Sequence, residues 1–463
     1  MSFDLIIRGA DVLTPAGLAE VDVAIAGGRI AALLGRGEGS APAQLAAGGL
    51  TLLPGVIDIH CHVRAPAFPQ RGSVESETRA AAAGGVTTLL EMPITRPCCN
   101  SAERVAMRRD HFSGRATVNF GLYCAPADIS AAGLRSVESA GAIAFKIFTT
   151  AAPVGREDEF EGLCQPGEAD QLAVLTALAS TGLPVVVHAE SEELLSYYAA
   201  RAASLDPALA TTHTAARPSI CETAAVTRVL TLNTIARAKL HIAHVTSRET
   251  VDVLRRFAGT SDFSAETCPH YLVRTNDDVG RVGVFGKINP PVRDAADQAA
   301  LWDALADGTI RHVTTDHATF ARSEKEAAAG DFLSAPAGVP GLEVLLPVML
   351  DAVASGRLEL ARAIDLVAAN AADRFGLPAK GRIEVGADAD LALVDLSATT
   401  TIHAPSLVTQ GRDVAQLYDG MQFRGRVKTT LVAGRVVFDN DAPLDVYPGR
   451  YVTPQRALGE LAA

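Results

Sequence analysis

Short apolar segments rich in β-branched residues alternate with Ala-rich segments between Pro54 and Pro378. The first kind is typical of buried strands, and the second of helices. We count eight predicted strands: VIDIHCHV, GVTTLLEM, ATVNFGLYC, AIAFKIFTT, PVVVHAE, KLHIAHVTS, DFSAETCPHY and IRHVTTDHA. Eight strand–helix units predict an α/β protein with a (β/α)8 TIM barrel. A doubly wound open sheet is the alternative, but no GxGxxG motif follows the first strand to indicate a dinucleotide fold.

Both ends of the chain are rich in short predicted strands and contain hairpin signals. The first end holds FDLIIRG, DVLT and VDVAIAGGRIAALL, and the last holds GRIEVGADADLALVDL and RVKTTLVAGRVVFDN, in which VAGRVV is typical of a hairpin tip. We therefore predict a small β-sandwich domain formed by both termini, from residues 1–53 and 381–450. The catalytic barrel is predicted over 54–380, and residues 451–463 form a C-terminal tail.

The composition excludes several classes of partner. The formal net charge of −12 argues against a nucleic acid or an anionic membrane as partner. The most apolar run, residues 172–187, is too short and too broken by polar residues to span a bilayer, and the first residues do not resemble a secretory signal. Seven cysteines without CxxC spacing are expected to be reduced, which favours a cytoplasmic location.

His60 and His62 stand two residues apart near the end of the first barrel strand. Side chains two apart in a strand leave on the same face, so both imidazoles are expected to point into one space. Neutral imidazole binds Zn and similar ions, and the HxH pattern therefore predicts a metal site. The simpler interpretation is two unrelated histidines, because so short a motif also occurs by chance.

Further candidates stand near the ends of later strands, where barrel enzymes carry their working residues. They are Lys146, His188, His244 and Asp316. Burial of Lys146 in AIAFKIF would lower its pKa, and a neutral amine can react with CO2 to give a carbamate that bridges two metal ions. Alternatively, the lysine reaches solvent or pairs with a carboxylate. Asp316 can bind a metal and hold a proton, or it can cap a helix.

Other polar residues are weaker candidates. Asp58 would face the same side of the strand as His60 and orient the site without binding metal. His241 is predicted to lie on the face opposite to His244, and His270 either lies near the site or fills a loop. We interpret three further histidines as structural or surface residues: His213, His312 and His403.

Taken in order, these segments resemble the amidohydrolase superfamily, and within it the cyclic amidohydrolases: allantoinases, hydantoinases, dihydropyrimidinases and dihydroorotases. The resemblance rests on PGVIDIHCH, GGVTTLLEMP, FKIF, VVVHAE, HIAHVTS, ETCPHYL, NPPVRD, TTDHA and PGLEVLLPVML. It implies two divalent ions, of Zn, Mn, Co or Fe, and ring-opening hydrolysis of a small cyclic amide. By this resemblance the first ion is bound by His60 and His62, and the second by His188 and His244. Carboxylated Lys146 bridges the two ions, and Asp316 binds the first and serves as acid and base.

The resemblance also bears on the subfamily. Arg64 matches the arginine with which dihydroorotases grip the substrate carboxylate, but Ile94 and Phe320 stand where an Asn and a His would complete that grip. An unpaired carboxylate would bind poorly, which disfavours dihydroorotate. The stretches EMPIT, VHAES and RPSICETAAVTRVL favour an allantoinase or hydantoinase. Asn289 aligns with a residue that contacts the substrate ring.

Three alternatives remain open at this stage. The chain could be a dihydroorotase-type hydrolase, a non-catalytic homologue, or an amidohydrolase with a different chemistry on the same site. All six ligand positions are filled, which argues against the non-catalytic homologue. The family resemblance further predicts a homo-oligomer, either a dimer or a tetramer.

Overall fold

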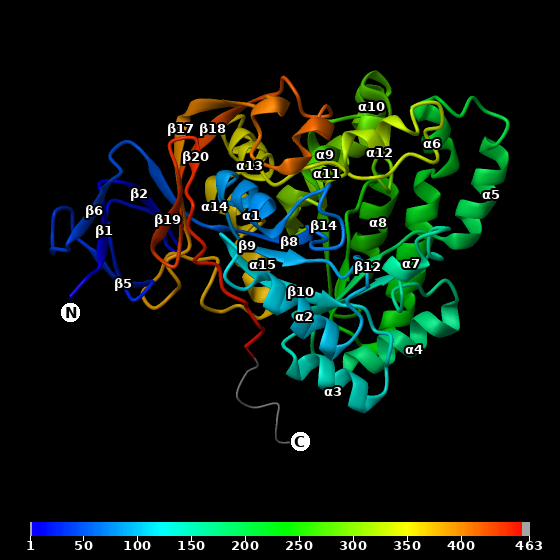
Figure 1. The fold of residues 1–463 in the computed structure, drawn as a ribbon, viewed down its shortest axis with the longest axis horizontal. Helices are drawn as coiled ribbons and strands as arrows, with labels where there is room; N and C mark the ends of the chain where they lie inside the picture. Colours follow the sequence, from blue (N-terminus) through cyan, green and yellow to red (C-terminus); the bar gives the residue numbers. More distant parts are fainter. Residues whose placement is uncertain (1, 456–463) are drawn as a thin grey trace.

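The central sheet of the computed structural model, which describes residues 2–455, is a closed parallel barrel. Its strands are β8 (Val56–His62), β9 (Val86–Glu91), β10 (Asn119–Cys124), β11 (Ala144–Phe148), β12 (Val185–His188), β13 (Leu240–Ile242), β14 (Phe263–Thr267), β15 (His312–Val313) and β16 (His317–Ala318). β15 pairs with β14, whereas β16 pairs with β8, so these two short strands form one interrupted eighth strand that closes the barrel. The predicted TIM barrel is confirmed (Figure 1).

Helices connect successive strands and surround the barrel (Figure 1). They are α1 (Val74–Ala83), α2 (Ala102–Phe112), α3 (Ala131–Ser139), α4 (Glu168–Ala179), α5 (Glu192–Ala202), α6 (Ala210–Ala216), α7 (Ser219–Ala236), α8 (Arg248–Phe257), α9 (Pro269–Val273), α10 (Asn276–Val282), α11 (Ala295–Asp307), α12 (Arg322–Glu326), α13 (Leu345–Ala354), α14 (Leu360–Asp365) and α15 (Ala369–Phe375). The predicted strand DFSAETCPHY ends earlier than expected, because Pro269 occupies the first turn of α9, where its missing N–H costs nothing.

Side-chain caps mark where several of these helices begin. The Ser73 hydroxyl accepts from the Ser76 N–H at α1, and Ser247 accepts from the Thr250 N–H at α8. At α11, the Asp294 carboxylate accepts from two N–H groups of the first turn. Such caps satisfy donors that have no partner within the helix. They therefore fix the points at which the chain turns from a strand end into the next helix.

Strands from both termini build a second, smaller unit beside the barrel. One sheet has the order β5-β4-β1-β6 and the other the order β20-β19-β18-β17-β7-β2-β3. The strands are β1 (Leu5–Arg8), β2 (Asp11–Thr14), β3 (Gly17–Ala19), β4 (Asp22–Ala26), β5 (Arg29–Leu34), β6 (Ala43–Ala46), β7 (Thr51–Pro54), β17 (Leu391–Thr401), β18 (Gln422–Val432), β19 (Arg435–Asp439) and β20 (Ala442–Pro443). An apolar core that includes Ile7, Ile25, Leu52 and Leu393 joins them. This is the predicted β-sandwich of both termini (Figure 1).

Two details of this unit bear on the sequence predictions. Ala433 and Gly434 form the tip between β18 and β19, as VAGRVV predicts, and both have positive φ. GRIEV at residues 381–385, in contrast, forms no strand. β7 pairs antiparallel with β17, with Pro54 opposite Leu391, and leads almost directly into β8. The sandwich therefore anchors the barrel strand that carries His60 and His62.

The last described residues pair with the barrel strand β10. The Phe120 N–H donates to the Arg450 carbonyl at 3.0 Å, and the Val452 N–H donates to the Phe120 carbonyl at 2.8 Å. Of the predicted tail 451–463, residues 456–463 lie outside the described residues.

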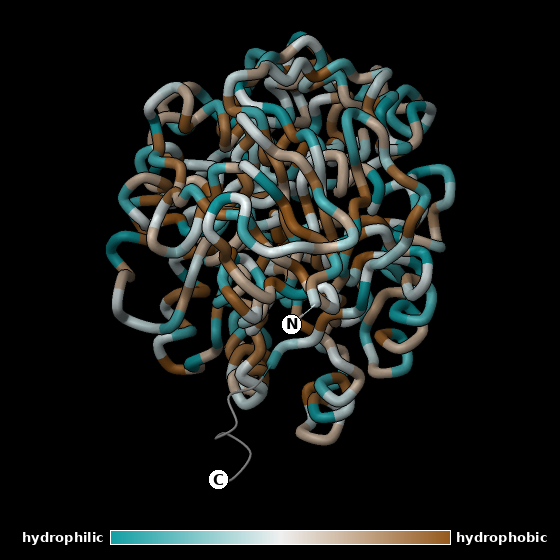
Figure 2. The backbone as a smooth tube through the Cα atoms, turned by 90° about the vertical axis from the view of Figure 1, so that its left-hand side faces the viewer, coloured by the Kyte–Doolittle hydropathy of each residue, from teal (hydrophilic) through white to brown (hydrophobic). Residues whose placement is uncertain are grey.

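Apolar segments concentrate toward the middle of the molecule in Figure 2. Within residues 2–455, no helix combines the length and the apolar character that crossing a bilayer requires.

Candidate metal centre and active site

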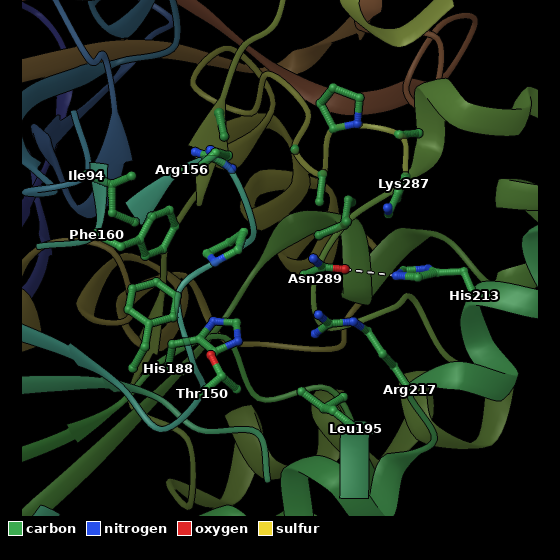
Figure 3. A pocket seen from close by; sticks show the side chains of 18 of the residues that line it. Ile94, Thr150, Arg156, Phe160, His188, Leu195, His213, Arg217, Lys287 and Asn289 are labelled. Carbon is green, nitrogen blue, oxygen red and sulfur yellow. Dashed lines mark hydrogen bonds between the residues drawn. The ribbon is translucent and has the colours of Figure 1, made fainter. Parts of the chain in front are cut away.

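A cavity of about 650 Å3 opens at the carboxyl ends of the barrel strands. Its lining includes residues from the predicted site and from the loops that follow the strands (Figure 3). The residues that concern the chemistry are His60, His62, Arg64, His188, His213, Arg217, His244, Lys287, Asn289 and Asp316. The cavity lies where TIM barrels carry their active sites.

His60, His62 and Asp316 converge at the base of the cavity. The Asp316 Oδ1 lies 3.4 Å from the His60 Nε2 and 3.2 Å from the His62 Nε2. One ligand atom from each residue falls within 4.8 Å of the others, which is close enough for one metal ion to bind all three. β8 contributes both histidines from one face, and the segment between β15 and β16 contributes the aspartate.

His188 and His244 form a second pair beside the first. The His188 Nδ1 lies 2.8 Å from the His244 Nε2, and the ring centroids of His60 and His244 are 5.5 Å apart. Burial lowers the pKa of both His188 and His244, so their rings are neutral near pH 7. Neutral imidazole is the form that binds metal ions, and these two rings present nitrogen atoms to one space.

Lys146 is fully buried within β11, and its Nζ has no hydrogen-bond partner. Burial lowers the pKa of Lys146 to about 8, while the nearby Glu266 and Asp316 carboxylates oppose the shift. A buried amine without a partner is costly, and it needs a compensating group. Carboxylation followed by metal binding would supply one. The nitrogen and oxygen donors together therefore suit two ions of the Zn, Mn, Co or Fe type.

The backbone at Asp316 is held in an unusual conformation. Asp316 has φ of 44°, Arg64 of 60° and His244 of 35°, values that non-glycine residues adopt where surrounding contacts impose them. The preceding residue, Thr315, is held by Asp58, which accepts from the Thr315 N–H at 3.0 Å and from the Thr315 hydroxyl at 2.5 Å. Asp58 also accepts from the His60 N–H at 3.3 Å. It thus joins the two strands whose side chains meet at the first metal position.

Electrostatics keep Asp316 ionised. Burial alone would raise its pKa, but His60, His62 and His244 lower it well below its usual range. Burial lowers the pKa of His62 to about 3, against the opposing effect of Asp316. An ionised Asp316 carboxylate beside a neutral His62 ring is a protonation state that permits metal binding.

Sequence reasoning missed two carboxylates that orient the metal-ligating histidines. Glu266 on β14 contacts the His60 Nδ1 at 2.5 Å and the His241 Nε2 at 3.0 Å. Glu190 contacts the His188 Nε2 at 2.9 Å and is paired with Arg217. Such partners fix the tautomer of a ligating histidine. A carboxylate two residues after His188, on the same face of the chain, is a signal that could have identified Glu190.

The prediction that His241 lies on the face opposite to His244 is wrong. His241 is fully buried and linked through Glu266 to His60, so it lies inside the barrel below the candidate metal centre. β13 ends at Ile242, and the positive φ of His244 turns the chain after it, so the period of two does not extend that far.

The interpretation of His213 as a structural or surface residue is also incomplete. His213 is buried, lines the cavity, and its Nε2 lies 2.8 Å from the Asn289 Oδ1 (Figure 3). His312 is bonded to backbone carbonyls away from the cavity, and the His403 side chain is 65% exposed. His270 is buried beside Tyr271, and neither of its ring nitrogens has a partner.

Arg64 and Asn289, the two predicted substrate contacts, both line the cavity. The Arg64 guanidinium stacks on the Phe320 ring at 4.8 Å, and its Nε and Nη1 have no partner. Burial lowers the pKa of Arg64 to about 9, with the nearby Arg156 and Arg71 guanidinium groups acting in the same direction. Phe320 and Ile94 make this part of the cavity wall apolar.

Fold and site together define the class of the protein: a TIM-barrel hydrolase with a histidine-rich centre for divalent metal ions. The model of the amidohydrolase family matches residues 51–437, and the chain belongs to this family. The resemblance found in the sequence is thereby confirmed.

Relatives in sequence and in structure agree with this assignment. The chain is 37% identical to an allantoinase from Rubrobacter xylanophilus and 32% identical to one from Escherichia coli K12, with at least 98% of each chain covered. Among solved structures it is similar to the L-hydantoinase (dihydropyrimidinase) from Arthrobacter aurescens, with a TM-score of 0.91, 30% identity, and coverage of 97% of this chain and 100% of that one. The dihydropyrimidinase from Brevibacillus agri has a TM-score of 0.88 at 27% identity, with 98% and 99% covered.

Proposed function

We propose that the protein opens a cyclic amide ring by hydrolysis, with a ureide, hydantoin or dihydropyrimidine ring as substrate. An activity of the allantoinase or hydantoinase type is the best-supported form of this proposal. The observation that carries it is the convergence of two histidine pairs and Asp316 at the base of one cavity, with the unpartnered Lys146 amine buried near His188 and His244. The names of the similar allantoinases and hydantoinases support the choice of substrate class.

In this proposal His60, His62 and Asp316 would hold one divalent ion, and His188 and His244 would hold the other. A carboxylated Lys146 would supply an anionic ligand for both. Two ions bound there would polarise the ring carbonyl and lower the pKa of a shared water molecule. Glu266 and Glu190 keep the ring nitrogens of His60 and His188 correctly oriented for this task.

Asp316 carries out the proton transfer. Because it is ionised, it accepts the proton of the attacking water and then returns it to the leaving ring nitrogen. The product is an N-carbamoyl acid, or allantoate where the ring is allantoin. We expect Asn289 and Arg64 to contact the substrate, since both line the same cavity.

A dihydroorotase-type activity is the second candidate, and one observation favours it. The Arg64 guanidinium faces the cavity with two unpartnered nitrogens, as a carboxylate-binding group would. Ile94 and Phe320 beside it offer no further hydrogen bonds, which favours rings without a carboxylate.

We further propose a cytoplasmic dimer or tetramer. The seven cysteines are free, as expected for a reducing compartment.

The test is to measure ring opening by the metal-loaded protein on four substrates in parallel: a 5-substituted hydantoin, allantoin, dihydrouracil and dihydroorotate. We expect one of the first three to be turned over best. A preference for dihydroorotate would overturn the choice of subfamily. If no ring is opened although two metal ions are bound per chain, the proposed substrate class is wrong. If no metal is bound, the proposed metal centre is wrong as well.

A further inference from the structure

Asn289 is held on a rigid wall of the cavity. The Lys287 carbonyl accepts from the Gly338 N–H at 2.9 Å, and the Pro290 carbonyl accepts from the Tyr271 hydroxyl at 2.8 Å. The backbone is thereby held two residues before Asn289 and one residue after it. What these contacts leave undetermined is the orientation of the side-chain amide, which can present either its oxygen or its NH2 group to the cavity.

His213 contacts that amide directly. Its Nε2 lies 2.8 Å from the Asn289 Oδ1, and Figure 3 shows Asn289 between the His213 ring and the side of the cavity that holds His188. His213 comes from α6, and its ring packs on the buried Phe332 with a centroid distance of 5.6 Å. The ring is therefore fixed in place from a second side.

The surroundings of His213 keep it neutral. Burial lowers its pKa to about 3, and the nearby Lys287 and Arg217 cations act in the same direction. A neutral imidazole has one N–H. Because an amide oxygen only accepts, the hydrogen of His213 must be on Nε2. The Asn289 oxygen then accepts the hydrogen bond from His213, and the Asn289 NH2 group is left to donate into the cavity.

From these contacts we propose that His213 is a positioning residue that fixes Asn289 as a hydrogen-bond donor toward the substrate. This inference rests on the proposed ring-opening function and adds to it the chemistry of the recognised group. The group is a hydrogen-bond acceptor, namely a ring carbonyl other than the one that is attacked. Arg217 and Lys287 also line the cavity beside Asn289. Because both side chains are hydrogen-bond donors, they favour an acceptor group of the substrate at this wall.

The kinetic test compares His213→Phe, which keeps the ring packing but loses the donor, with His213→Gln, which retains a donating amide. With the ring that the wild type opens best, His213→Phe should raise KM about tenfold at nearly unchanged kcat and metal content, as for the loss of one neutral hydrogen bond. His213→Gln should recover most of this loss. Asn289→Asp, which offers no donor, should lower kcat/KM by about a hundredfold. The same substitution at the exposed His403, His403→Phe, is the control and should behave as wild type.

Two results of this experiment would overturn the proposal. One is a His213→Phe variant with wild-type KM. The other is an equal loss of kcat and bound metal in both His213 variants, which would indicate a purely structural role.

A second measurement does not depend on turnover. In protein with 15N-labelled histidine, the His213 signals, assigned by their absence in His213→Phe, should report the neutral Nε2–H tautomer between pH 6 and 8. The Nδ1–H tautomer would make Nε2 an acceptor and turn the Asn289 oxygen toward the cavity, which would refute the proposal even if the protein opened none of the four rings. With the expected tautomer but no turnover, the proposed function fails and the orientation of Asn289 stands.

Discussion

Replacement of the buried Lys146 by methionine should stabilise the metal-free protein while it removes the activity of the metal-loaded protein. Methionine has a similar length and no charge, so it fills the same space within β11 without an unpartnered ammonium. The fall of the Lys146 pKa from 10.5 to about 8 corresponds to roughly 3 kcal/mol of destabilisation while the amine is charged. We therefore expect Lys146→Met to raise the free energy of unfolding at pH 7 by about this amount.

The pH dependence provides a second check of the same argument. Between about pH 8 and 10.5, the folded protein has lost the Lys146 proton and the unfolded chain still holds it. The free energy of unfolding of the wild type must then rise with pH, because the unfolded state binds more protons. The advantage of Lys146→Met should accordingly be full below pH 8 and disappear toward pH 10.5.

The assay is urea unfolding at a series of pH values, in buffer with chelator and without bicarbonate, so that the amine remains unmodified. The partly exposed Lys428 provides the control, since Lys428→Met should change stability little at any pH. In parallel, the metal-loaded Lys146→Met protein should lose activity on the order of a thousandfold, because it lacks the ligand that we propose bridges the two ions. A variant less stable than wild type at pH 7, or one that retains a tenth of the wild-type turnover, would refute the reasoning.

Three further predictions follow from other parts of the structure. Asp316→Ala should fold normally but lose nearly all turnover, and a tenth of wild-type kcat would contradict its role in proton transfer. Burial lowers the pKa of Lys325 to about 7, so the stability of the wild type should rise between about pH 7 and 10.5, and Lys325→Met should remove this rise. Thermal unfolding at a series of pH values measures it, and an unchanged dependence of stability on pH in the variant would show that Lys325 is not the cause. A Cβ on Gly55 would lie 2.2 Å from the Thr87 Oγ1, so Gly55→Ala should lower the free energy of unfolding by about 2 kcal/mol. Gly330 lies in open space, and Gly330→Ala should lower it by well under half of that amount. Equal losses in the two variants would contradict the packing argument.

Several features of the site were predictable because they depend on local sequence. Strand–helix alternation identifies the barrel, and the ends of its strands identify the region of the active site. The period of two in β8 brings His60 and His62 to one face, as the structure shows. The apolar surroundings of Lys146 in AIAFKIF predict its burial in the same way.

Other features depend on contacts between segments far apart in the chain, which no local pattern encodes. Glu266 meets His60 across 206 residues, and His213 meets Asn289 across 76. The His241 prediction failed because β13 ends before the periodic pattern does, and His213 was misjudged because its helix lies outside the barrel strands. Local patterns were thus enough to predict the barrel and the kinds of residue at its strand ends. Which carboxylate orients which histidine, and which residue contacts the Asn289 amide, could be read only from the folded chain, because these pairings depend on burial and on hydrogen bonds that form when distant strands close into one barrel.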